Sequence, residues 1–143
     1  RCKKSIIKER KFFNNIQNLQ FVNNTNNIAD LEFDYIVDTQ CLCDIADENI
    51  ISNLLCKLYK ILNSDGSIIS ISALPNEDDA NLLFNIFTKN NFYLNKLETV
   101  TFKGISGYQG YTKTIFNKFN TNYKYNLEKY FLQLRRKISR LSC

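Results

Sequence analysis

The spacing of apolar residues switches along the chain between an extended and a helical period, and this pattern predicts its elements. Apolar runs rich in β-branched and aromatic residues predict strands at Leu19–Val22, Phe33–Asp38, Ser67–Ser72, Phe92–Phe102 and Tyr111–Phe119. Apolar residues at helical spacing predict helices at Ser5–Phe13, Ile50–Leu62, Asn76–Phe87 and Leu127–Leu141.

Residues that favour helix ends stand at the expected boundaries. Asp47 is an expected N-cap, and Asn76 after Pro75 begins the next helix, where acidic residues suit its positive end. After Leu62 the chain turns at Asn63–Gly66, and we expect Gly66 to supply a positive φ there.

The order of the predicted elements indicates an α/β fold. Strands that alternate with helices over short linkers favour a mostly parallel sheet with helices on both faces. The last two strands are consecutive and predict an antiparallel hairpin at the edge of the sheet. At 143 residues the chain holds one domain of ordinary size. We expect an α/β domain over residues 1–120 and a basic amphipathic helix over 121–143.

Charge is unevenly distributed around an acidic centre. The net charge is +5 overall, with +5 in residues 1–11, −7 in residues 12–110 and +7 in residues 111–143. The C-terminal helix separates its basic residues from an apolar stripe. We expect the stripe to dock on the sheet and the basic face to stay in solvent. Contact with RNA, an acidic protein or an anionic membrane is the alternative, although no RNP motif supports nucleic acid.

The composition removes several classes of chemistry. The chain has no His, which excludes a Ser-His-Asp or Cys-His site and any His-ligated metal within it. Its five cysteines include no Cys-x-x-Cys pair, so we expect no metal site and interpret them as buried free thiols in a reducing, cytoplasmic compartment. No run of 18 apolar residues is present, so no membrane span is expected.

Two segments together resemble class I S-adenosylmethionine-dependent methyltransferases. They are the strand Phe33-Asp34-Tyr35-Ile36-Val37-Asp38 and the helix, Gly turn and strand from Leu55 to Ser72. The segment Asp38–Asp44 lies where the elongation-factor lysine methyltransferase group carries a D-K-G-T-L-D-A-like motif, with Thr39 and Gln40 in place of Lys and Gly. The chain is most similar to that group, over roughly residues 5–119.

The resemblance implies a fold, a cofactor and a substrate class. It implies a Rossmann-like sheet, S-adenosylmethionine as the methyl donor and a protein lysine as the acceptor, for example on a translation factor. The first two strands of the family fold and its Gly-rich loop have no counterpart here, because all four glycines lie after residue 65. We expect these parts upstream of Arg1.

The residues that follow the Phe33–Asp38 strand are the best site candidates, because ligands of open α/β sheets sit beyond the carboxyl ends of strands. We expect Asp38 and Gln40 to be catalytic and Asp38 and Thr39 to bind the cofactor. The resemblance implies that Thr25, near the position where the family contacts adenine, binds the cofactor as well. The alternative role for Asp38 is a loop cap. Asp44 and Asp47 are expected to cap the next helix, and Cys41 and Cys43 to pack.

Tyr108 and Tyr111 either border a substrate channel or pack at the sheet edge. Three hypotheses stay open for the whole chain. The first is a methyltransferase domain, the second is a catalytically inactive methyltransferase-like interaction module, and the third is a basic nucleic-acid-associated α/β protein.

Overall fold

The computed structural model describes residues 28, 31–104 and 107–142. The chain divides into two compact units, Arg1–Glu32 and Phe33–Cys143, and every element below belongs to the second. The predicted helix Ser5–Phe13 and strand Leu19–Val22 lie outside the described residues.

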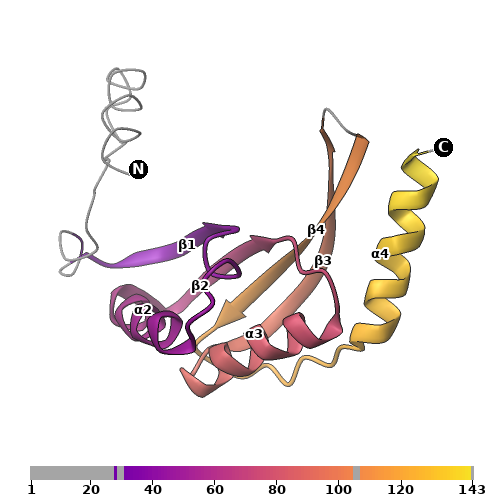
Figure 1. The fold of residues 1–143 in the computed structure, drawn as a ribbon. Helices are drawn as coiled ribbons and strands as arrows, with labels where there is room; N and C mark the ends of the chain where they lie inside the picture. Colours follow the sequence, from indigo (N-terminus) through magenta and orange to yellow (C-terminus); the bar gives the residue numbers. More distant parts are fainter. Residues whose placement is uncertain (1–27, 29–30, 105–106, 143) are drawn as a thin grey trace, which may run out of the picture. The chain divides into compact units, whose positions relative to one another are not determined.

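The second unit follows the predicted order of elements from Phe33 onward (Figure 1). Its strands and helices are β1 (Phe33–Thr39), α2 (Glu48–Ile61), β2 (Leu62–Ser72), α3 (Glu77–Lys89), β3 (Tyr93–Gly104), β4 (Gly107–Asn117) and α4 (Leu127–Ser142). None of the helices in this described part is both long enough and apolar enough to span a bilayer.

The four strands form one mixed sheet in the order β1-β2-β4-β3. Only β1 and β2 are parallel, whereas β4 is antiparallel to both β2 and β3. The expectation of a mostly parallel sheet is therefore wrong for the described strands. The reason is that β4 inserts between β2 and β3, so the hairpin supplies an interior strand as well as the edge.

The described helices lie on one face of the sheet, and the expectation of helices on both faces stays a prediction because the predicted helix Ser5–Phe13 lies outside the described residues. Phe87 of α3 stacks on Phe116 of β4 at 3.9 Å between ring centroids. Helix α2 lies beside α3 (Figure 1), and Asn90 after α3 donates a hydrogen bond to Ser52 of α2 at 3.1 Å. On the opposite face Tyr35 and Val37 remain 68% and 63% exposed.

Aromatic rings fill the core between α3 and the sheet. Phe87, Phe92 and Phe116 are completely buried, and Phe84 meets Phe116 edge to face at 5.8 Å. Burying rings of this size supplies a large share of the hydrophobic stabilisation of a small domain.

The predicted N-cap of α2 is confirmed, and Asn76, predicted to begin the next helix, is the N-cap of α3. Asp47 accepts a hydrogen bond from the Asn49 amide at 2.8 Å, and Asn76 accepts one from the Asp79 amide at 3.0 Å. Each bond satisfies an amide that the helix itself leaves without a partner.

Gly66 has a different role from the predicted one. Helix α2 passes directly into β2 at Leu62, and Gly66 lies within that strand without a positive φ. The pairing of β1 with β2 is irregular here, since Phe33 pairs with Leu62 but Tyr35 pairs with Ser67. A Cβ atom at Gly66 would lie 2.8 Å from the Leu62 side chain and 3.0 Å from the Asp34 carbonyl oxygen, so the glycine permits a close approach of backbone and core.

Helix α4 docks through its apolar stripe, as expected. The stripe residues Leu127, Tyr130, Phe131 and Leu134 are buried. Leu141, the apolar residue near the C-terminal end of the helix, is an exception at 37% exposed. The stripe therefore covers the sheet over most of the helix and leaves its last turn in solvent.

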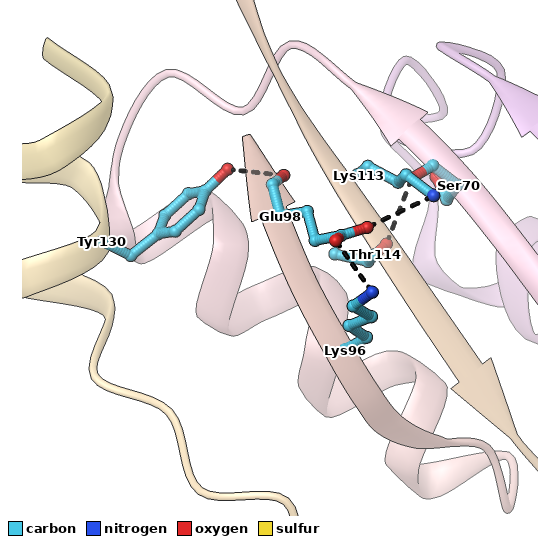
Figure 2. Close-up of polar contacts among 6 residues, drawn as sticks. All are labelled: Ser70, Lys96, Glu98, Lys113, Thr114 and Tyr130. Atoms are coloured by element: carbon cyan, nitrogen blue, oxygen red, sulfur yellow. Dashed lines mark hydrogen bonds and ion pairs between the residues drawn. The ribbon is translucent and has the colours of Figure 1, made fainter. Parts of the chain in front are cut away.

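One hydrogen bond and one close approach fix α4 against the hairpin. Figure 2 shows the Tyr130 hydroxyl donating to the Glu98 carbonyl oxygen of β3, at 3.1 Å. A Cβ atom at Gly110 of β4 would lie 2.7 Å from Leu134 and 2.6 Å from Ile138, so α4 sits directly on the strand. This contact places α4 on the same face of the sheet as α3.

Candidate functional site

The candidate site lies at the carboxyl ends of the parallel pair β1 and β2. There the loop Gln40–Ala46 leads into α2, and the loop Ala73–Asn76 leads into α3. Because parallel strands end at the same edge, the two loops are brought together in space.

Asp38 is the central polar residue of this edge and is only 9% exposed. Its Oδ1 accepts hydrogen bonds from the Cys41 and Leu42 amides at 3.1 and 3.2 Å. Its Oδ2 accepts one from the Ser70 hydroxyl at 2.8 Å. Both carboxylate oxygens thus hold the protein's own loop, which matches the loop-cap role that the sequence left open.

Gln40 joins the two loops. It has a positive φ of 66°, and its amide donates to the Ile71 carbonyl oxygen at 3.0 Å. Its Oε1 accepts hydrogen bonds from the Ala73 amide at 3.2 Å and the Cys43 thiol at 3.3 Å. Gln40 therefore fixes the loop after β1 to the loop after β2.

The other predicted cofactor residues are placed differently. Thr39 is exposed at the end of β1, next to Asp38 and Gln40. Thr25 lies outside the described residues, so its expected role stays a prediction. The structure thus brings together Asp38, Thr39 and Gln40 of the proposed set.

A row of buried hydroxyl groups behind Asp38 was not anticipated from the sequence. Ser70 and Ser72 of β2 share a hydrogen bond of 3.0 Å, and Thr114 of β4 donates to the Ser70 carbonyl oxygen at 3.4 Å. The Thr112 hydroxyl, beside Ser72, is buried and has no hydrogen-bond partner. The alternation Ser70-Ile71-Ser72 was the available signal, because alternate positions of a strand share one face.

A pocket of about 300 Å³ opens between the two loops and the first turns of α2 and α3. Leu42, Leu74 and Leu83 form part of its apolar wall. Acidic residues also line it; they are Asp44, Glu48 and Asp79. A cavity with apolar walls and carboxylates suits a ligand that has an apolar body and a cationic end.

The thiol in this pocket is not activated. Burial raises the pKa of the Cys43 thiol above its ordinary value; its hydrogen bond with Ser72 lowers it by less, and the Asp44 carboxylate raises it further. Cys43 therefore stays protonated near neutral pH and is a poor nucleophile.

The described cysteines are free thiols, as expected, but the expectation that they are buried is wrong, since Cys43 is only half-buried. The other two, Cys41 and Cys56, are exposed. Both lie on surface positions, Cys41 in the loop after β1 and Cys56 on the outer side of α2, where no core packing encloses them. Cys2 and Cys143 lie outside the described residues.

The remaining candidates contribute to the fold. Asp47 caps α2 as expected, but the expectation that Asp44 also caps this helix is wrong, because Asp44 precedes the cap and accepts a hydrogen bond from the Cys43 thiol at 3.7 Å. Tyr111 packs edge to face on Phe102 at 5.4 Å and donates to the Gln109 side chain. The Tyr108 side chain lies outside the described residues.

Comparison of whole folds relates this arrangement to known structures. A SAM-dependent methyltransferase from Methanosarcina mazei aligns with a TM-score of 0.54 and 11% identity, over 70% of this chain and 66% of that one. A protein assigned as a type 11 methyltransferase from Sulfolobus solfataricus aligns at 0.51 with 16% identity, over 85% and 70% of the two chains. LaPhzM aligns at 0.55 with 10% identity, over 75% of this chain and 38% of its own.

These similarities define a class of fold. No family model matches the chain, and no curated protein matches it either. The described part is an α/β unit with a four-stranded mixed sheet that matches part of the Rossmann-like fold of SAM-dependent methyltransferases. The chain spans 66% of the first neighbour and 38% of LaPhzM. The comparisons give no support to the elongation-factor lysine methyltransferase group.

Proposed function

We propose that this domain acts in SAM-dependent methyl transfer, with the loop Gln40–Ala46 forming one wall of the methyl-donor site. The observation that supports the proposal is the ordering of this loop by hydrogen bonds. Asp38 and Gln40 order it at the carboxyl end of a parallel strand pair, in a methyltransferase-like fold. Ligands of open α/β sheets bind at such ends.

The loop suits a positioning role. Methyl transfer is an in-line displacement at the donor sulfonium, and the protein contributes chiefly by aligning the reactants. Asp38 is occupied by the Cys41 and Leu42 amides and Ser70, so it orders the loop, while the exposed Thr39 is free to meet the donor. The described residues would contact one side of a donor molecule. The Gly-rich loop that contacts the other side in the family fold has no counterpart in residues 1–143, because no glycine precedes Gly66.

The pocket beside the loop favours a lysine of a protein as the methyl acceptor. A lysine side chain has an apolar stem of four methylene groups and a cationic end. The pocket offers apolar walls together with the carboxylates of Asp44, Glu48 and Asp79. This match supports the acceptor class that the resemblance implies, and a protein partner such as a translation factor remains a proposal.

Amide chemical shifts test the donor site. Adding millimolar S-adenosylhomocysteine to the isotope-labelled chain is expected to shift the amides of Thr39–Asp44 and Ala73 and to leave those of β3 unchanged. Binding is expected to be weak, because the chain forms only part of an enclosing crevice. Shifts confined to β3, β4 or α4, or none at all, would refute the proposed donor wall.

The acceptor site is tested separately with Nα-acetyl-lysine amide as the probe. Its binding is expected to fall in the variant Glu48→Gln/Asp79→Asn and to persist in Asp65→Asn, which removes an exposed carboxylate outside the pocket. Equal binding of the probe by all three proteins would exclude this pocket as the acceptor site while leaving the donor site intact.

A binding module without catalysis is the second candidate. The hydrogen bonds of Asp38 favour it, since both of its carboxylate oxygens hold the protein's own groups and neither is left to meet a reactant. Methyl transfer from labelled SAM by the natural polypeptide decides between the two. Transfer would exclude the inactive module, and lysine-probe binding without transfer would establish it.

A further inference from the structure

A second hollow lies away from the methyltransferase-like edge, between β3, the connection after β4 and the start of α4. It is a shallow groove, open to solvent, with a volume of about 440 Å³. Its lining combines aromatic, basic and amide side chains, among them Tyr123, Tyr125, Lys124, Lys129 and Gln133. This aromatic and basic lining differs from the acidic lining of the first pocket, so we expect the groove to bind a different kind of ligand.

Two tyrosines in this groove present exposed rings. Tyr123 and Tyr125 are 37% and 44% exposed, and their rings lie within 24° of parallel at 6.2 Å between centroids. Tyr125 is also fixed edge to face against the buried Phe84 at 5.7 Å. The groove therefore offers aromatic faces on a partly rigid support, which favours stacking with a planar ligand.

Basic side chains extend from the groove along α4. Lys129, Arg136 and Arg140 lie on one side of the helix, at separations of about 10 and 6 Å along its axis given a rise of ~1.5 Å per residue. All three are exposed, and in the part of the chain that the structure describes none lies within ion-pair distance of a carboxylate. We call Lys129, Arg136 and Arg140 the basic stripe.

The docking of α4 determines which kind of partner the basic stripe can contact. The apolar side of the helix is buried against the fold, and Tyr130 is tied to the Glu98 carbonyl oxygen of β3 (Figure 2). The helix cannot then insert an apolar face into a lipid surface, as interfacial helices do. Its solvent side offers cations in a line that begins at a groove with exposed aromatic rings.

We propose that the groove and the basic stripe bind a single-stranded nucleic acid. Bases stack on Tyr123 and Tyr125, and the amides of Asn126 and Gln133 contact base edges. Phosphates track from Lys124 and Lys129 along the stripe. An acidic protein would use the cations but not the aromatic faces. This binding is independent of the methyl-donor site.

Fluorescence anisotropy of labelled oligouridine and oligothymidine, each about ten nucleotides long, tests the electrostatic part. The variant Lys129→Gln/Arg136→Gln/Arg140→Gln is expected to lose about tenfold or more in affinity, and its salt slope is expected to fall by about 2. The matched control Lys57→Gln/Lys60→Gln/Lys89→Gln removes the same charge from α2 and α3 and is expected to bind like the parent. Equal losses in the two variants would overturn the proposal, since net charge alone would then explain binding.

Stacking is tested with a single exposed ring. Tyr123→Leu is expected to weaken oligouridine binding about fivefold or more, whereas Phe119→Leu, at an exposed aromatic outside the groove, is expected to leave it unchanged. Thermal melts confirm that the variants fold. Equal binding of duplex and single strand, with Tyr123→Leu unaffected, would refute single-strand recognition. Loss of binding to phosphatidylserine vesicles by the stripe variant, with oligonucleotide binding unchanged, would point to a membrane surface and overturn the proposal.

Discussion

The covered face of the sheet has two halves that are built on different principles. At one end Ile68 and Phe116 pair across β2 and β4 beneath the aromatic rings of α3. Two residues further along each strand the same face carries Ser70 and Thr114, followed by Ser72 and Thr112. One half is held by apolar burial and the other by directed hydrogen bonds.

The difference separates stability from positioning. Buried aromatic and aliphatic groups are stabilised by loss of contact with water, in proportion to their area. A buried hydroxyl gives little net stability, because it exchanges one hydrogen bond with water for one within the protein. The polar half lies directly behind the loop that Asp38 orders, so its residues serve the geometry of that loop more than the stability of the fold.

Removing a ring from the aromatic half is expected to have the largest effect. Phe87→Ala deletes a fully buried ring that stacks on Phe116, and we expect unfolding by urea to show a loss of about 3–5 kcal/mol. Phe102→Ala, at a ring that is 50% exposed, should cost less than about 1 kcal/mol. Similar losses at the two positions would contradict the importance of the aromatic half.

The docking of α4 buries a second set of apolar side chains, over Gly110 of the hairpin, and is tested next. Phe131→Ala and Leu134→Ala should each lower the stability by about 2–4 kcal/mol, because both side chains are buried under the helix. Replacing Arg135, Arg136, Lys137 and Arg140 with Gln should barely change the melting temperature. If stability were indifferent to Phe131 and Leu134, the helix would be free of the sheet.

In the polar half, Asp38→Ala is expected to have a smaller effect of about 1–3 kcal/mol. It leaves the Cys41 and Leu42 amides without their acceptor, so hydrogen exchange of these amides should accelerate selectively. Asp44→Ala, in the same loop but exposed, is the control and should change neither. A loss as large as that of Phe87→Ala would show that Asp38 supports the whole fold.

Thr112→Val is expected to raise the stability of the protein, whereas the substitutions above lower it. The Thr112 hydroxyl is buried without a partner, so replacing it with a methyl group should stabilise the protein by about 1 kcal/mol. Thr114→Val removes a hydroxyl that does have an acceptor and should not stabilise. Calorimetric melting temperatures distinguish the two variants, and a lower melting temperature for Thr112→Val would indicate that its hydroxyl does have a hydrogen-bond partner.

The smallest effect is expected on the outer face of the sheet. The hydrogen bonds from Lys96 and Lys113, at 2.8 and 3.2 Å, lower the pKa of Glu98 (Figure 2). A lowered pKa means that its stabilising contribution is present above the ordinary pKa of Glu and is lost as the pH falls through the lowered value. The difference in melting temperature between the parent and Glu98→Gln should therefore shrink below about pH 4. A constant difference would rule out the ion pairs as its cause.

The sequence predicted the elements from Phe33 onward because their periods are clear, and it located the loop after β1. It could not show that β4 inserts between β2 and β3, since local pattern does not determine strand neighbours. The sequence predicted β2 as a strand but did not show that Ser70 and Ser72 take its covered face. The predicted role of Gly66 was also wrong. The close approach of Leu62 and Asp34 to Gly66 depends on the tertiary structure, which local sequence does not show.

The side chain of Gln40 makes the two loops thermodynamically interdependent. One amide oxygen accepts from Ala73 in the loop after β2 and from Cys43 in the loop after β1. A ligand that orders either loop thus lowers the cost of ordering the other, and the coupling is reciprocal by linkage. Substitutions in the two loops should accordingly be non-additive, and a double-mutant cycle between them should lose its interaction free energy once Gln40 is replaced.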